Sequence, residues 1–317
     1  MKNMDNQLLN EFYKTSKLDA CLCLYPGLSC KGKPIKAHSI QNSRVFDLLS
    51  SDGHLIGLKM KTNKSHRLNI SFDKVGRNRA STFEGFCSKH DKDLFEDIDD
   101  FEFDINNKKQ LFLLAYRSVV KELHASMSKA IKIQTGYLNK KEKGLIKKNG
   151  ISEEGLFATQ CIIEAFEVYQ YKNQLDSALL NDNYQILTHR ILEIETTEPK
   201  LACSQLFSND SVLYKDSVSR IIMNIFPKTR ELTYAIFSST NGEKEIVDDY
   251  LYKCIHGDSD LKKYEISKMV IRNSENFFIN PNHFETWSKQ KQDKILEYFI
   301  DTLLQDKEKD DYDYYLF

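Results

Sequence analysis

The placement of cysteine and histidine constrains this chain more than any other feature of its sequence. Six residues separate Cys23 from Cys30, and two residues separate Cys87 from His90. Zinc takes four nitrogen or sulfur ligands at the corners of a tetrahedron, and small folds supply them as two short-range pairs that are far apart in the sequence. Cys87 and His90 have the spacing of a tight turn that leads into a helix. The pattern therefore predicts a structural zinc site at which two distant segments meet.

Two cysteines compete for one position in this set. Cys21 and Cys23 project to opposite faces of an extended chain, so one of them is expected to bind together with Cys30. Cys23 is preferred because the Pro26-Gly27 turn lies between it and Cys30, and Cys21 is the alternative ligand. The other interpretation is that these side chains are buried thiols, which are common in protein cores. Core thiols are also predicted at Cys161, Cys203 and Cys254.

The composition predicts a folded chain with a substantial core. Of the 317 residues 41% are hydrophobic, and glycine (12) and proline (5) are sparse, which favours helices and strands over loops. Residues 1–92 carry 16 Lys or Arg and 8 Asp or Glu, whereas residues 93–104 carry seven acids and no base. A basic segment of this kind is typical of a module that faces a polyanion. We expect an α+β protein, with a small zinc-stapled module at residues 1–104 and a mostly helical α+β body at residues 105–317.

The sequence predicts no membrane contact. The first 20 residues contain acidic side chains and no apolar run of about 7–15 residues, so they do not resemble a secretory signal. No segment approaches the roughly 18 consecutive apolar residues that a membrane-spanning helix needs. We expect a cytoplasmic protein, and the abundance of lysine, asparagine and isoleucine is typical of a bacterial one.

Apolar periodicity places the main elements. Residues 108–134 and 152–180 have helical spacing, and Ser152 is expected to cap the second of these helices. Residues 82–99 are predicted as a loop that enters a helix. Strands are predicted over residues 55–61, 67–73, 185–196, 220–227 and 231–240, and helices over residues 243–255, 260–278 and 282–304.

The stretches CLCLYPGLSC, AHSIQ and GRNRASTFEGFCSKHD together resemble a divergent HNH, or ββα-metal, endonuclease module on a treble-clef zinc scaffold. The resemblance covers about residues 20–100. It implies that the structural zinc ligands are Cys23, Cys30, Cys87 and His90, with His90 at the place where the family usually has its last cysteine.

The resemblance also implies a catalytic set. His38 would be the general base that activates water, a role for which histidine is suited near neutral pH. Asp91 falls where the family's metal-binding histidine usually lies, and it would bind Mg²⁺ or Mn²⁺ on the scissile phosphate. Asn78 would be the asparagine that orients the base. Ala37 stands where the family commonly has an acidic metal ligand.

A basic edge on the predicted hairpin and its return loop suits phosphate contacts, which supply affinity without reading the base sequence. DNA is expected rather than RNA. A solvated lysine-rich face is the alternative interpretation of the same residues. The candidate contact residues are Lys59, Lys61, Arg67, Arg77 and Arg79.

Two functional hypotheses follow. The first is a metal-dependent endonuclease or a nuclease-derived nucleic-acid-binding protein, and by analogy with other small nuclease modules it would act in prokaryotic antiviral defence. The second is a non-enzymatic adaptor that contains structural zinc and binds a partner protein through residues 105–317.

Overall fold

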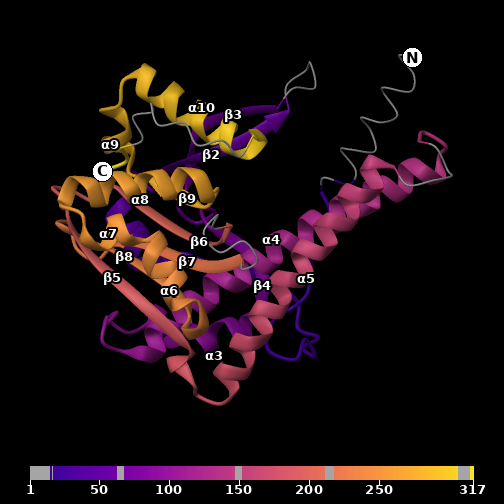
Figure 1. The fold of residues 1–317 in the computed structure, drawn as a ribbon, viewed down its shortest axis with the longest axis horizontal. Helices are drawn as coiled ribbons and strands as arrows, with labels where there is room; N and C mark the ends of the chain where they lie inside the picture. The colour runs from indigo at the N-terminus through magenta and orange to yellow at the C-terminus, as the bar shows by residue number, and fades with distance from the viewer. Residues whose placement is uncertain (1–14, 16, 63–67, 147–151, 211–217, 306–314) are drawn as a thin grey trace. The chain divides into compact units, whose positions relative to one another are not determined.

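The fold is mixed α+β, as the sequence predicts. A computed structural model describes residue 15 and residues 17–62, 68–146, 152–210, 218–305 and 315–317 (Figure 1). The chain forms two compact units that interleave along the sequence. Because compact units need not fold independently, the predicted domain boundary between residues 104 and 105 stays a prediction. Unit 1 comprises residues 1–37, 83–94 and 119–183, and unit 2 comprises residues 38–82, 95–118 and 184–317.

A two-stranded sheet precedes the first long helix of the described chain. Strand β1 (Pro34–His38) pairs with β4 (Thr82–Cys87), and α3 (Ser88–Asp99) follows β4 directly. The prediction of a loop over residues 82–87 was wrong. Gly85 lies within this strand, where a Cβ would lie 2.4 Å from the ring of Phe83.

Two long helices supply most of unit 1. They are α4 (Lys108–Glu142), which belongs to unit 1 from residue 119, and α5 (Glu153–Leu180). Ser152 caps α5 as predicted, because its Oγ accepts a hydrogen bond from the Gly155 N–H at 3.1 Å. The helices pack through a cluster that contains the small side chains of Ala130, Cys161 and Ala165.

Unit 2 is built on a seven-stranded sheet in which every recorded pairing is antiparallel. The order across it is β3-β2-β9-β6-β7-β8-β5. The bounds are β2 His54–Thr62, β3 Leu68–Gly76, β5 Leu187–Glu195, β6 Leu201–Asp210, β7 Val218–Pro227, β8 Leu232–Thr240 and β9 Phe277–Ile279.

Both faces of this sheet are buried. Along β8, Tyr234 and Ile236 join one apolar cluster, whereas Ala235 and Phe237 join the other. Since successive side chains of a strand point to opposite faces, this alternation shows that each face has its own core. The helices α6 to α10 cover one face. Their bounds are α6 Lys244–Tyr250, α7 Tyr252–His256, α8 Ser259–Asn273, α9 Pro281–Glu285 and α10 Lys289–Gln305.

Two strands of the sheet were not predicted. Strand β6 contains Ser204, whose Oγ lies 2.9 Å from the Ser118 Oγ and whose carbonyl accepts a hydrogen bond from Asn276 Nδ2 at 2.8 Å. Its polar core residues interrupt the apolar pattern that marks a buried strand. Strand β9 overlaps the end of the helix predicted over residues 260–278 and is only three residues long. The short helical turns are η1 Asn42–Phe46, α2 Asp47–Leu49, η2 Tyr184–Ile186 and η3 Asn241–Glu243.

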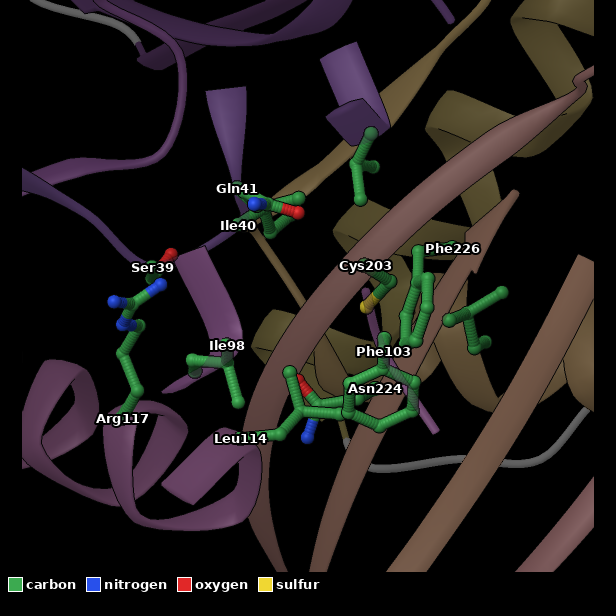
Figure 2. Close-up of a pocket in the computed structure, with 12 residues that line it drawn as sticks. Ser39, Ile40, Gln41, Ile98, Phe103, Leu114, Arg117, Cys203, Asn224 and Phe226 are labelled. Atoms are coloured by element: carbon green, nitrogen blue, oxygen red, sulfur yellow. The ribbon is translucent and has the colours of Figure 1, made fainter. Parts of the chain in front are cut away.

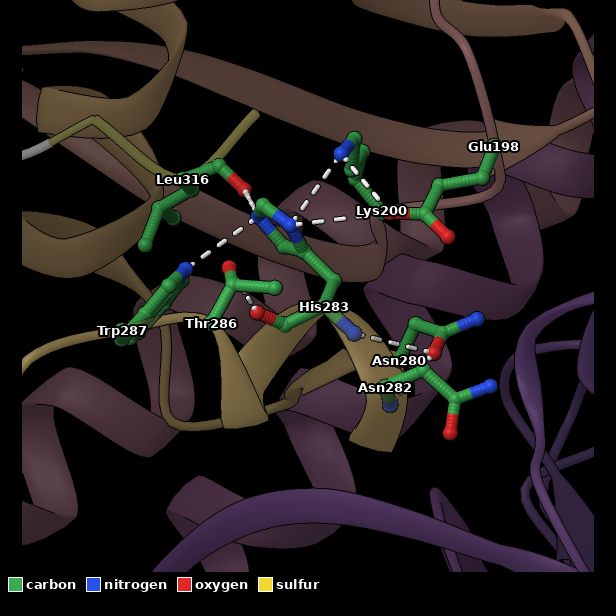
Figure 3. A network of polar contacts seen from close by, with 8 residues as sticks. All are labelled: Glu198, Lys200, Asn280, Asn282, His283, Thr286, Trp287 and Leu316. Atoms are coloured by element: carbon green, nitrogen blue, oxygen red, sulfur yellow. Dashed lines mark hydrogen bonds and ion pairs between the residues drawn. The ribbon is translucent and has the colours of Figure 1, made fainter.

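The last residues of the chain are anchored in unit 2 by a polar network (Figure 3). Leu316 is fully buried, and its carbonyl lies 2.9 Å from His283 Nε2. His283 Nδ1 in turn lies 3.1 Å from Lys200 Nζ. The indole N–H of Trp287 also points at His283 Nε2, at 3.3 Å, so both ring nitrogens lie within hydrogen-bond distance of polar groups.

Candidate metal centre

Four side chains expected as metal ligands meet in unit 1. The ligand atoms of Cys23, Cys30, Cys87 and His90 all lie within 4.8 Å of one another. The first two come from the irregular segment before β1, Cys87 ends β4, and His90 lies in the first turn of α3. The strand-to-helix junction thus presents the second pair to the first, and the group could hold a metal ion.

The distances between the ligand atoms are similar to one another. His90 Nδ1 lies 3.4 Å from Cys23 Sγ and 3.5 Å from Cys87 Sγ, and the Sγ atoms of Cys30 and Cys87 are 3.8 Å apart. The imidazole therefore faces the sulfur atoms through Nδ1. The ring of His90 is held in this orientation by Tyr25, which stacks on it with a centroid distance of 3.8 Å and an interplanar angle of 12°.

Backbone N–H groups point at two of the sulfur atoms. The Gly32 N–H donates to Cys30 Sγ at 3.3 Å, and the Cys87 N–H donates to Cys23 Sγ at 3.4 Å. Such bonds stabilise thiolates and fix the direction of their lone pairs. Gly32 has no room for a side chain, because a Cβ there would lie 2.9 Å from the Cys87 Cβ.

The surroundings of Cys23 disfavour a thiolate without a charged partner. Burial raises the pKa of the Cys23 thiol to about 11, despite the N–H groups of Cys87 and Tyr25 that lower it. A thiolate at this position therefore needs a positive partner. The pKa of Cys87 is lowered from its ordinary value, chiefly by a backbone hydrogen bond from His90.

The remaining cysteines lie outside this group. Cys21, the alternative ligand, is exposed and is not among the four clustered residues, so the geometry selects Cys23. Three other cysteines are buried as predicted, with exposed fractions of 0%, 1% and 2% at Cys161, Cys203 and Cys254.

The candidate general base is the last residue of β1. His38 Nδ1 lies 3.0 Å from the Ala80 carbonyl, so Nδ1 carries the proton and Nε2 is left with the lone pair. Burial lowers the pKa of His38 below its ordinary value of 6.5, with Ala80 opposing this shift. The imidazole is therefore neutral at pH 7, which is the form that accepts a proton.

The other two candidate catalytic residues have different surroundings. Asn78 is exposed, and its Oδ1 accepts a hydrogen bond from Asn42 Nδ2 at 3.0 Å. Among the described residues, the hydrogen-bond partner of the His38 ring is thus the carbonyl of Ala80, two residues beyond Asn78. Asp91 lies in the first turn of α3, directly after His90. Asp91 belongs to unit 1, whereas His38 and Asn78 belong to unit 2.

The predicted nucleic-acid contact residues are partly neutralised. Lys59 and Lys61 lie 2.9 and 3.5 Å from the same carboxylate, that of Asp73. Arg77 pairs with Asp47, and Arg79 is exposed. Arg67, the fifth predicted contact residue, lies outside the described residues.

Tyr25 and Gly32, which contact the ligand side chains, were not predicted. Each lies two residues after a predicted ligand, and this spacing is the signal that could have found them. Their roles depend on His90 and Cys87, which are more than 50 positions away in the sequence.

Comparison with known proteins gives no relative. No family model, curated protein or solved structure matches the chain. Within the described residues, no helix is both long enough and apolar enough to cross a membrane.

Proposed function

We propose that this protein binds one structural zinc ion through Cys23, Cys30, Cys87 and His90. The convergence of four nitrogen and sulfur ligand atoms carries the proposal. At a tetrahedral zinc ion, bond lengths of about 2.3 Å to sulfur and 2.0 Å to nitrogen place two sulfurs about 3.8 Å apart, and a sulfur and a nitrogen about 3.5 Å apart. The observed separations of 3.8, 3.4 and 3.5 Å agree with these values.

The number of ligands supports a structural role. A catalytic zinc site keeps one position open for water or substrate, whereas a structural site is closed by four protein ligands. With all four positions occupied by side chains, this ion would hold the segment before β1 against the junction of β4 and α3. Hydrolysis would need a second, harder cation.

On this scaffold we propose an HNH-like endonuclease that uses Mg²⁺ or Mn²⁺. The order of features supports it: a ligand pair, a strand that ends in His38, the hairpin of β2 and β3, a strand that ends in Cys87, and a helix whose first turn carries His90 and Asp91. His38 would accept the proton of the attacking water at Nε2. Asp91 would bind the divalent cation, and exposed cations such as Arg79 would contact the phosphates of DNA.

A plasmid-cleavage assay tests the catalytic proposal. The full-length protein should cleave DNA with Mg²⁺ or Mn²⁺, and His38→Ala should lower the rate by about 100-fold or more. The matched control is His54→Ala, because His54 is also a strand residue of unit 2 and is exposed. Equal rates for His38→Ala and the wild type, at equal zinc content, would contradict the role of His38.

The second candidate function is a zinc-containing adaptor. It is favoured by an apolar stripe on α5, where four side chains are between 40% and 59% exposed. Exposed apolar patches on helices commonly mark protein contacts. Absence of cleavage by zinc-loaded wild type with either cation would remove the nuclease proposal and leave the adaptor. The stripe consists of Leu156, Ile162, Ile163 and Phe166.

A further inference from the structure

Two cavities of unit 2 differ in the charge of their walls. The cavity drawn in Figure 2 has a volume of about 40 Å³ and a mostly apolar wall, and its cation, Arg117, donates to the carboxylate of Asp99 at 2.9 Å. A second cavity, of about 70 Å³, is formed by the end of α6, by α7 and by α8. The charged residues that line it are three cations and one acid: Lys253, Lys268, Arg272 and Glu265.

The acid in this wall matches one of the cations. Lys253 Nζ lies 3.4 Å from Glu265 Oε1, so the charges of these two side chains offset each other. The other two lining cations, Lys268 and Arg272, add two positive charges to the wall. An empty cavity with such a wall attracts anions.

The two additional cations lie on one face of α8. Lys268 and Arg272 are four residues apart on this helix, so their Cβ atoms are about 5–6 Å apart on successive turns. Both residues are half-buried. Like charges at this spacing repel each other, and an anion bound between the two head groups would remove the repulsion.

The rest of the wall is uncharged. Cys254 is 2% exposed, and burial raises the pKa of its thiol to about 12, with Glu265 adding to the shift and Lys253 opposing it. The thiol is therefore protonated at pH 7, so it neither repels an anion nor acts as a nucleophile. Met269 and Tyr250 complete the wall. The cavity thus suits binding rather than a reaction.

The size of the cavity selects a compact anion. A water-sized group needs about 10–15 Å³ on this scale, so there is room for about five such groups. A phosphate ion has five heavy atoms. A phosphoryl group with one substituent carries about 1.5–2 negative charges at pH 7, which matches the two additional positive charges of the wall.

We propose that this cavity binds a phosphate dianion, either the free ion or the phosphoryl group of a small monoester, between the ammonium of Lys268 and the guanidinium of Arg272. The site lies in unit 2 and does not depend on the metal centre or on the nuclease proposal.

Titration calorimetry of the full-length protein with inorganic phosphate tests the site. Binding should saturate at one phosphate per chain and should weaken as sodium chloride is added. Dimethyl phosphate, a larger anion with a single charge, should bind about tenfold more weakly or worse. No saturable phosphate binding, or equal binding of dimethyl phosphate, would overturn the proposal.

Methyl phosphate distinguishes the two sources of the dianion, and both results support the site. Affinity equal to that of inorganic phosphate would identify the phosphoryl group of a monoester as the ligand. Weaker binding of methyl phosphate would identify the free ion, because the added methyl group then does not fit the cavity.

A charge-removing variant locates the binding. Lys268→Gln should weaken phosphate binding by about tenfold or more, because it removes a hydrogen bond between charged groups. The matched control is Lys263→Gln, since Lys263 is also a half-buried lysine of α8 but does not line the cavity. Equal affinity of the two variants would overturn the proposal. Arg272→Gln is the second variant, and wild-type affinity in it would count equally against the site.

Discussion

Two regions of this protein are stabilised by different kinds of interaction. The sheet of unit 2 has an apolar core on both faces, with side chains such as Ile222 and Phe237 fully buried. The segment from residue 17 to residue 33 has almost no regular structure, and it is held by sulfur, nitrogen and backbone contacts around Cys23. Ordering an irregular residue costs about 1–2 kcal/mol, so such a segment needs a strong local constraint. We therefore expect that a metal ion held by these side chains would order this segment of unit 1, whereas apolar burial stabilises unit 2.

Loss of the metal should give the largest difference in local order between the two regions. Structural zinc binding contributes about 10–16 kcal/mol in small zinc domains, so Cys87→Ala should disorder the segment before β1. The amide of Leu24, which donates to the Gly85 carbonyl at 2.7 Å, should lose at least 100-fold of its hydrogen-exchange protection. The amide of Ile225 in β7 should keep its protection.

The matched control is Cys161→Ala, because Cys161 is also a buried cysteine of unit 1 but lies outside the ligand group. It should keep the metal and the protection of the Leu24 amide. Equal exchange at Leu24 in Cys87→Ala and Cys161→Ala would contradict the role of the metal in local order.

Truncation of a side chain in the sheet core should have the opposite effect: it should lower the stability of unit 2 and leave the metal centre intact. Phe237→Ala removes a fully buried ring from β8, and such changes cost about 3–5 kcal/mol. Chemical denaturation followed by circular dichroism measures the loss, and metal analysis of the folded variant should still give one zinc per chain. Loss of zinc from this variant under folding conditions would show that the two regions are not held separately.

Acid should weaken unit 2 through His283. Burial, followed by the charge of Lys200, lowers its pKa from 6.5 to about 4, with the charge of Lys291 adding to the shift and that of Glu198 opposing it. The folded state therefore holds the ring neutral while the unfolded chain takes up a proton. The stabilisation is complete above pH 6.5 and is lost as the pH falls from 6.5 to 4, by on the order of 3 kcal/mol.

Denaturation of the wild type and of His283→Gln at several pH values measures this contribution. The stability advantage of the wild type should shrink across the interval from pH 6.5 to 4. A constant difference between the two proteins over that interval would contradict the lowered pKa.

The smallest expected effect is a loss of metal affinity when a residue that contacts the metal ligands is changed. Gly32→Ala places a Cβ 2.9 Å from the Cys87 Cβ and disturbs the N–H that faces Cys30 Sγ. Changes around metal ligands typically cost 10–100-fold in metal affinity. Competition with a chromogenic chelator should show this loss, whereas Gly242→Ala, where a Cβ meets nothing within 4 Å, should bind zinc as the wild type does.

The sequence predicted the elements whose pattern is local. The helix from Ser152 has a capping serine and helical periodicity, and the paired strands β2 and β3 are two apolar runs that lie close together in the sequence. Strands β6 and β9 were missed because their assignment depends on distant partners. The buried Ser204 in β6 is satisfied by Ser118 and Asn276, which no local pattern reveals.

The candidate metal ligands were likewise predictable only where the signal is local in the sequence. Its four residues could be found because metal chemistry restricts both residue type and spacing. The choice between Cys21 and Cys23 was argued from the local turn, and the distances support the preferred residue. Tyr25 and Gly32 act through tertiary contacts with His90 and Cys87, so composition and periodicity carry no information about them.

X-ray absorption spectroscopy at the zinc edge tests the central claim most directly. The full-length protein, purified without added metal, should contain one zinc ion with three sulfur neighbours at about 2.3 Å and one nitrogen neighbour at about 2.0 Å. His90→Cys should convert the spectrum to four sulfur neighbours. Absence of zinc, or a wild-type spectrum with two or fewer sulfur neighbours, would contradict the ligand set of Cys23, Cys30, Cys87 and His90.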